Sequence, residues 1–104
     1  MKFLKGSFPI QNIPAMRERI WVVSGWVDST NTYGFYKYGK VWKATDLVSG
    51  TLVVTQPTRK ACAEWIETHG SNIAEKKETY DYRLKVESFR IELKEVLNEA
   101  EQVG

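Results

Sequence analysis

The sequence is poor in the residues from which most small catalytic and metal sites are built. It has one cysteine, Cys62, and one histidine, His69, in 104 residues. One cysteine cannot form a disulfide within the chain, and one cysteine with one histidine cannot form a zinc cage. The two lie about 10 Å apart along one predicted helix, too far for a nucleophile and its base. We expect no metal, no cofactor and no catalytic role for either residue.

Enzyme motifs and long apolar runs are missing too. The chain has no phosphate-binding glycine-rich loop, no G-x-S-x-G turn and no H-E-x-x-H helix. No apolar run approaches the roughly 20 residues of a membrane span, and the first residues lack the apolar centre of a signal peptide. With 42% hydrophobic and 27% charged residues, the composition is that of an ordinary folded domain. We therefore expect a single-domain, cytoplasmic, non-enzymatic protein that acts by binding.

Charge is distributed unevenly along the chain. Residues 1–60 carry nine Lys/Arg against three Asp/Glu, for a net charge of +6, whereas residues 61–104 carry six against ten, for −4. Nine of the thirteen aromatic residues also lie in the basic part. Such asymmetry is a sign of nucleic-acid or partner binding. A basic sheet beside a solvated acidic helix would produce the same pattern.

The stretch 33–43 is the most unusual in the chain, with five aromatic residues and three lysines. In one continuous strand, alternation would place Tyr36, Tyr38, Lys40 and Trp42 on one face and Tyr33, Phe35, Lys37, Val41 and Lys43 on the other. Exposed rings can stack on unpaired bases while lysines attract phosphates. The candidate nucleic-acid contacts are Tyr36, Lys37, Tyr38, Lys40, Lys43 and Arg59. Under the alternative interpretation, Trp21, Phe35, Trp42 and Trp65 are simply core residues.

The expected fold is α+β. Residues 1–19 contain Pro9, Pro14 and Gly6 and are predicted to form an N-terminal arm. An antiparallel sheet of three to four strands is predicted over 20–55, with an interruption near Gly39 and a hairpin over 41–55. Thr58 is a good N-cap for a helix over 58–69 that covers the sheet.

The C-terminal region is predicted to form a long acidic helix over 71–102. Seven apolar residues follow the spacing of one helical stripe: Tyr82, Val86, Phe89, Leu93, Val96, Ala100 and Val103. Strict alternation over Thr79–Val86 favours a strand instead. A second apolar set, Tyr80, Leu84 and Ile91, predicts a protein interface. The partner is either a second copy of the chain, in a homodimer, or another protein. In the latter case the chain would be an interaction or inhibitor module of a mobile element.

Two local resemblances accompany these patterns. The hairpin 41–55 followed by the helix 58–66 resembles the arm-binding domains of phage-type integrases, which lay a three-stranded sheet in the major groove. That resemblance implies that Lys37, Lys40, Lys43 and Arg59 contact DNA. The octapeptide 31–38 also resembles the aromatic motif of RNA-recognition domains at four positions, although only 30 residues precede it, too few for the strand, helix and strand that such a domain requires.

Overall fold

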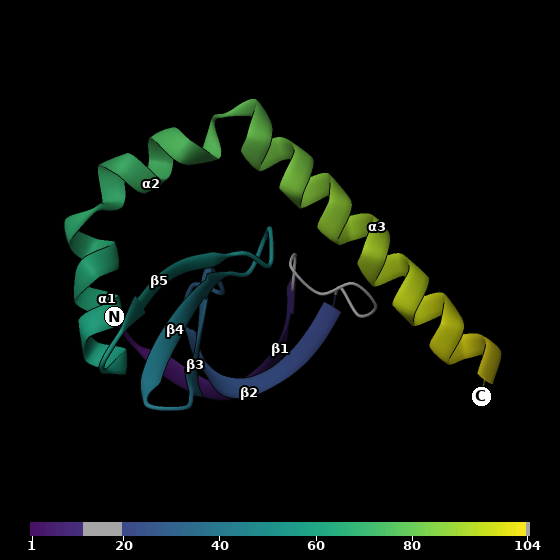
Figure 1. Cartoon of the computed structure of the whole chain (residues 1–104), viewed down its shortest axis with the longest axis horizontal. Coiled ribbons are helices and arrows are strands. Elements are labelled where there is room, and N and C mark those ends of the chain that lie inside the picture. Colours follow the sequence, from purple (N-terminus) through teal and green to yellow (C-terminus); the bar gives the residue numbers. More distant parts are fainter. Residues whose placement is uncertain (12–19, 104) are drawn as a thin grey trace.

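Five consecutive antiparallel strands form one curled sheet in the order β1-β2-β3-β4-β5. The computed structural model describes residues 1–11 and 20–103 (Figure 1). The elements are β1 Phe3–Gln11, β2 Ile20–Asp28, β3 Tyr33–Tyr38, β4 Val41–Asp46, β5 Leu52–Gln56, α1 Arg59–Thr68, α2 Gly70–Lys77 and α3 Tyr80–Val103. The chain is a small α+β domain, which confirms the predicted class. No helix among these residues is long and apolar enough to cross a membrane.

The first strand corrects the expectation of an N-terminal arm. Residues 3–11 pair with β2 over nine positions, so the sheet has five strands and not three or four. Pro9, which argued against a strand, is tolerated because β1 is an edge strand and needs hydrogen bonds on one side only. The rest of the predicted arm, 12–19, lies outside the described residues. The five successive strands also fit neither the strand-helix-strand start of an RNA-recognition domain nor a three-stranded sheet.

The aromatic stretch forms two strands joined by a tight turn. Gly39 and Lys40 make this turn, and Gly39 has a positive φ of 63°, which glycine adopts without steric cost. The turn reverses the alternation assumed for one continuous strand, because it pairs Tyr36 with Lys43 and Lys37 with Trp42. The predicted face assignment was therefore wrong beyond Tyr38. Lys43 shares a face with the two tyrosines, and Trp42 lies on the face of Phe35.

The sheet has two apolar faces. On the face that α1 covers, here called the α1 face, Phe35 and Ala44 are fully buried against Cys62, Ala63 and Ile66. The opposite face has a smaller cluster, in which the buried Phe8 and Ile10 of β1 lie against Tyr36 of β3. The Phe8 and Tyr36 rings meet edge to face at 6.1 Å. Both sides of β3 are thus anchored, and this fixes the direction of its side chains.

The sheet splits between β2 and β3. These strands pair only at Trp26↔Phe35 and Val27↔Gly34, although β2 is nine residues long. The split starts at Gly25, whose backbone crosses β3 so closely that a Cβ there would lie 2.0 Å from the Phe35 carbonyl oxygen. Beyond this crossing, the first half of β2 separates from Tyr36–Tyr38. No strand pairing joins these two segments.

Curling brings the end of β1 to the β4–β5 turn. The Gln11 backbone N–H donates to the Gly50 carbonyl at 2.7 Å, and Gln11 Nε2 donates to the Ser49 carbonyl at 2.9 Å. The strong curvature of β1 and β2 is visible in Figure 1. Together with the split, this closure makes a hollow in the opposite face of the sheet.

The helices follow the sheet. The Thr58 side chain accepts from Ala61 N at 3.0 Å, so the predicted cap of α1 is confirmed. The predicted long C-terminal helix is confirmed as α3, but it does not extend back to residue 71, because the chain breaks between Lys77 and Tyr80. Thr79 Oγ1 donates to the Lys76 carbonyl and accepts from Tyr82 N, which ends α2 and starts α3. The strand considered for Thr79–Val86 is therefore helix from Tyr80 on.

Asp28 fixes the β2–β3 connection, and its titration should be visible in the stability of the fold. Burial alone would raise the pKa of this carboxyl, but hydrogen bonds from the Thr30 hydroxyl and from the Tyr33 and Thr32 backbone N–H groups outweigh burial and lower the pKa below 3.8. The lowered pKa adds stability above the unfolded-state pKa, and that stability is lost as pH falls through the folded-state value.

We expect Asp28→Asn to lower the free energy of unfolding by about 1 kcal/mol at neutral pH. Below about pH 4 the stability of the variant should also fall less steeply with decreasing pH than that of the wild-type protein, because the variant has no carboxyl group to protonate at this position. Urea unfolding at several pH values measures both effects. Parallel curves for the two proteins down to the lowest pH would contradict this role of Asp28.

Candidate functional site

The split in the sheet opens into a cavity of 610 Å³, here called the split-sheet cleft. Strands β2 and β3 form its sides, and the ends of β1 and β5 close it. Its lining residues are Ile10, Gln11, Trp21, Val23, Ser24, Tyr36, Lys37, Tyr38, Lys43, Thr51 and Leu52. A shallower hollow on the α1 face shares Ser24 and Lys37 with this cleft. The split can therefore be approached from both faces of the sheet.

Exposed rings stand at the mouth of the cleft. The side chain of Tyr38 is 57% exposed and that of Trp21 is 40% exposed, whereas Tyr36 is buried at 8%. Lys43 Nζ lies over the Tyr38 ring at 4.4 Å from its centre, so a cation and a stacking surface act as a unit. Burial raises the pKa of Tyr36, with the nearby Tyr38 adding to it, so its phenol stays neutral at neutral pH. The cleft thus presents flat apolar surface next to positive charge.

Among the described residues, the cleft is lined by cations and by no acid. Lys37 and Lys43 line it, and the exposed Lys40 lies in the adjacent β3–β4 turn. The acidic residues of the described strands, Asp28 and Asp46, are only 5% and 3% exposed. The charge that this part of the sheet shows to solvent is consequently positive.

The structure divides the predicted nucleic-acid contacts into two groups. Tyr36, Tyr38 and Lys43 line the split-sheet cleft, Lys37 borders it from the α1 face, where it is paired with Trp42, and Lys40 lies beside it. Arg59 lies apart on the α1 face, where its guanidinium carbon is 4.4 Å from the centre of the Trp26 ring and also lies over the Phe3 ring. Arg59 does not line the cleft.

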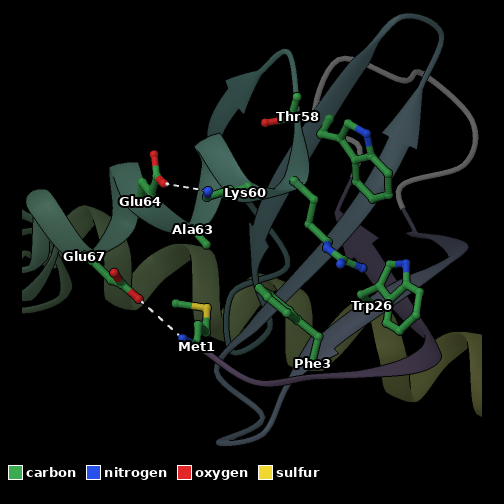
Figure 2. A pocket seen from close by; sticks show the side chains of 10 residues that line it. Met1, Phe3, Trp26, Thr58, Lys60, Ala63, Glu64 and Glu67 are labelled. Atoms are coloured by element: carbon green, nitrogen blue, oxygen red, sulfur yellow. Dashed lines mark ion pairs between the residues drawn. The ribbon is translucent and has the colours of Figure 1, made fainter.

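Arg59 belongs to a second cavity, of 690 Å³, between α1 and the sheet (Figure 2). This helix-side cavity is larger than the cleft, but it is lined by two acids as well as by cations. Lys60 Nζ lies 4.0 Å from Glu64 Oε1, and the N-terminal amine of Met1 lies 3.6 Å from Glu67 Oε1. Because acids and cations alternate here, the helix-side cavity attracts an anion less strongly than the cleft does.

A third cavity, of 390 Å³, lies under α2 and the start of α3. Its polar centre is the buried carboxylate of Asp46, which accepts from the Tyr82 hydroxyl at 2.6 Å and lies 3.9 Å from Lys77 Nζ. Burial and the neighbouring carboxylate raise the pKa of Tyr82, so this hydrogen bond persists over the whole physiological range. These contacts fasten the helices to the β4–β5 turn, and we regard this cavity as structural.

Cys62 and His69 take part in packing. Cys62 is fully buried, burial raises the pKa of its thiol, and its Sγ donates to the Trp42 carbonyl at 3.5 Å. His69 ends α1, with Nδ1 at 2.8 Å from the Trp65 carbonyl and its ring stacked on Trp65. Neither residue lines the cleft.

The residues of the predicted protein interface lie on α3. Tyr80, Leu84 and Ile91 are 72%, 51% and 52% exposed. Their positions fall within about 40° of one another around the helix, at 100° per residue. They form one exposed stripe, here called the outer stripe, which faces away from the sheet.

Comparisons with known proteins found no relative: no family model matches the chain, and neither a curated protein nor a solved structure matches it.

Several residues of the cleft were not among the predicted contacts. Trp21, Gln11 and Leu52 reach it only because the sheet curls and splits. The sequence carries one signal of this arrangement, Gly25, because a glycine inside a strand often marks a bulge or a close approach of another backbone. That glycine indicates where two strands meet closely but not which residues then face each other.

Proposed function

We propose that the chain binds single-stranded nucleic acid in the split-sheet cleft. The observation that carries this proposal is the combination of exposed rings, Trp21 and Tyr38, with Lys37, Lys40 and Lys43 in and beside a cleft that no acidic residue of 1–11 or 20–98 lines. Aromatic rings that stack on bases contribute about 1–3 kcal/mol for each base. Lysines beside the rings attract the phosphates that link those bases.

The geometry favours single strands over duplexes. A base can stack on Tyr38 or Trp21 only when its own face is free, and in a duplex each face is covered by the neighbouring stacked base pairs. The cleft is also a hollow between two strands, and α1 lies on the far side of the sheet. It offers no helix or protruding ribbon of the kind that enters a major groove. Ring stacking does not depend on base identity, so we expect weak sequence preference.

The proposal is tested by the affinity of the wild-type protein for a fluorescent oligonucleotide of about 12 nucleotides. Fluorescence anisotropy should show binding to the single strand and weaker binding to the matching duplex. With three lysines at the phosphates, the logarithm of affinity should fall with the logarithm of salt at a slope of about −2, so a fourfold rise in salt weakens binding about 20-fold. The absence of binding to either oligonucleotide at low salt would overturn the proposal.

A further inference from the structure

The apolar stripe of α3 packs on the sheet along only part of its length. The Tyr82 hydroxyl donates a hydrogen bond to Asp46. Phe89 is 2% exposed, and its ring lies so close to Gly50 that a Cβ added to Gly50 would be 2.5 Å from the ring. Further along the helix, Val96 is 46% exposed and Leu97 is 63% exposed. Figure 1 shows this end of α3 projecting beyond the sheet. The domain therefore has an amphipathic helix end that nothing in its own described residues covers.

The charge of this helix end is opposite to that of the cleft. From residue 95 to 103 the helix end has three glutamates and no lysine or arginine, for a net charge of −3. The cleft and its turn carry three lysines and display apolar surface at Trp21, Tyr38 and Leu52, the last of which is 56% exposed. The helix end and the cleft are therefore complementary, because both expose apolar side chains and their charges have opposite sign.

The helix end cannot reach the cleft of its own chain. Tyr82 and Phe89 hold the first half of α3 on the β4–β5 turn, and the remaining residues continue as one rigid helix for about 20 Å, at 1.5 Å per residue. The cleft lies back at the start of α3, since Gln11 lines it and also donates to the Lys85 carbonyl at 3.3 Å. Only the helix of another molecule can approach it from the opposite direction.

We propose that two copies of the chain form a two-fold dimer in which the α3 end of each copy occupies the split-sheet cleft of the other. Two antiparallel α3 helices place each acidic end beside the start of its partner, where the cleft lies. Val96 and Leu97 pack on the exposed rings, and the negatively charged helix end lies beside Lys37, Lys40 and Lys43. A reciprocal contact of this kind closes on itself, as in most homodimers.

The dimer does not depend on the proposed nucleic-acid binding, but it has a consequence for it. Phosphates and the negatively charged helix end would lie beside the same lysines, so a single-stranded oligonucleotide and the helix end exclude each other from the cleft. Self-association would then keep the cleft covered until nucleic acid displaces the acidic helix.

Charge exchange between two variants tests the dimer without any nucleic acid. The first variant carries Glu95→Lys, Glu99→Lys and Glu101→Lys, the three acids of the helix end. The second variant carries Lys37→Glu, Lys40→Glu and Lys43→Glu. The wild-type protein should dimerise in sedimentation velocity experiments. Each variant alone should dissociate with a Kd raised more than about tenfold, because like charges then face each other.

An equimolar mixture of the two variants should dimerise again. In that mixed dimer, the reversed helix meets the reversed cleft and the native helix meets the native cleft. Circular dichroism checks that both variants remain folded. A wild-type protein that stays monomeric, or a mixture that does not associate, would overturn the proposal.

A control on the outer stripe distinguishes the other way in which α3 could pair. Leu84→Ser with Ile91→Ser leaves the helix end and the cleft intact, so the dimer should persist unchanged. If this control variant is monomeric while both charge variants dimerise, the dimer forms through the outer stripe. The proposal that each α3 end occupies the cleft of the other copy would then be wrong.

Discussion

Reversing Lys37, Lys40 and Lys43 together to glutamate should abolish oligonucleotide binding. The substitutions remove three phosphate contacts and place three negative charges beside the path of the nucleic acid, so we expect affinity at low salt to fall at least about 100-fold. Lys37 and Lys40 are exposed, and no ion pair joins any of the three lysines to another described residue. The fold should therefore survive, and fluorescence anisotropy with circular dichroism measures both results.

A matched control separates local contacts from net charge. Lys76, Arg83 and Arg90 are exposed cations on α2 and α3, away from the cleft and from the helix end. Changing these three to glutamate alters the net charge by the same amount and should weaken binding only slightly, through the long-range field. If both triple variants lose the same affinity, binding is a diffuse charge effect and not a property of the cleft.

Gly25→Ala should be among the most destabilising single substitutions in the chain. The added Cβ would lie 2.0 Å from the Phe35 carbonyl oxygen and 3.1 Å from Tyr36 Cα, and both are backbone atoms that cannot rotate away. The strands must therefore separate where β2 joins β3. We expect a loss of about 3 kcal/mol or more in the free energy of unfolding, measured by urea or thermal denaturation.

Gly6 provides the control, because it lies directly opposite Gly25 in the β1–β2 ladder. A Cβ at Gly6 would meet only Val27 Cγ2, at an ordinary 3.6 Å. Gly6→Ala should leave stability unchanged or raise it by a few tenths of a kcal/mol, since alanine loses less backbone entropy than glycine on folding. Equal stability of the two variants would show that β2 does not cross β3 as described.

Local sequence signals predicted the parts of the fold that local interactions determine. The Thr58 cap and the apolar face of α1 depend on residues within one or two turns. The break between α2 and α3 depends equally on a local cap at Thr79, but helical periodicity continues across Glu78 and Thr79 and hid it. Periodicity identifies the face of a helix better than it locates interruptions.

The N-terminal strand was missed because its pairing is not local. Pro9 and Gly6 are poor strand residues by composition, yet β1 gains nine paired positions from β2 and keeps Pro9 at a free edge. Strand formation reflects its neighbours more than its own residues. The turn at Gly39 had a visible signal, and the error there was to extend the alternation across it.

The candidate site was predictable in its chemistry and not in its geometry. Four predicted residues of the stretch 33–43 line one cleft because β3 and β4 are adjacent strands of one hairpin. Arg59 was included because the resemblance to arm-binding domains implied a DNA contact there, and the fold places it on the α1 face. The other wall of the cleft, from Trp21 to Ser24, depends on the splitting of the sheet, which no local pattern predicts.

Mapping the contact surface by NMR tests the central claim most directly. Titrating ¹⁵N-labelled protein with a single-stranded oligonucleotide should shift the amide signals of Trp21, Lys37, Tyr38, Lys43 and Leu52, together with the Trp21 indole N–H. Signals from α1 and from the helix-side cavity should stay in place. Shifts centred on Trp26 and Lys60, or a spectrum that does not change at low salt, would contradict binding in the split-sheet cleft.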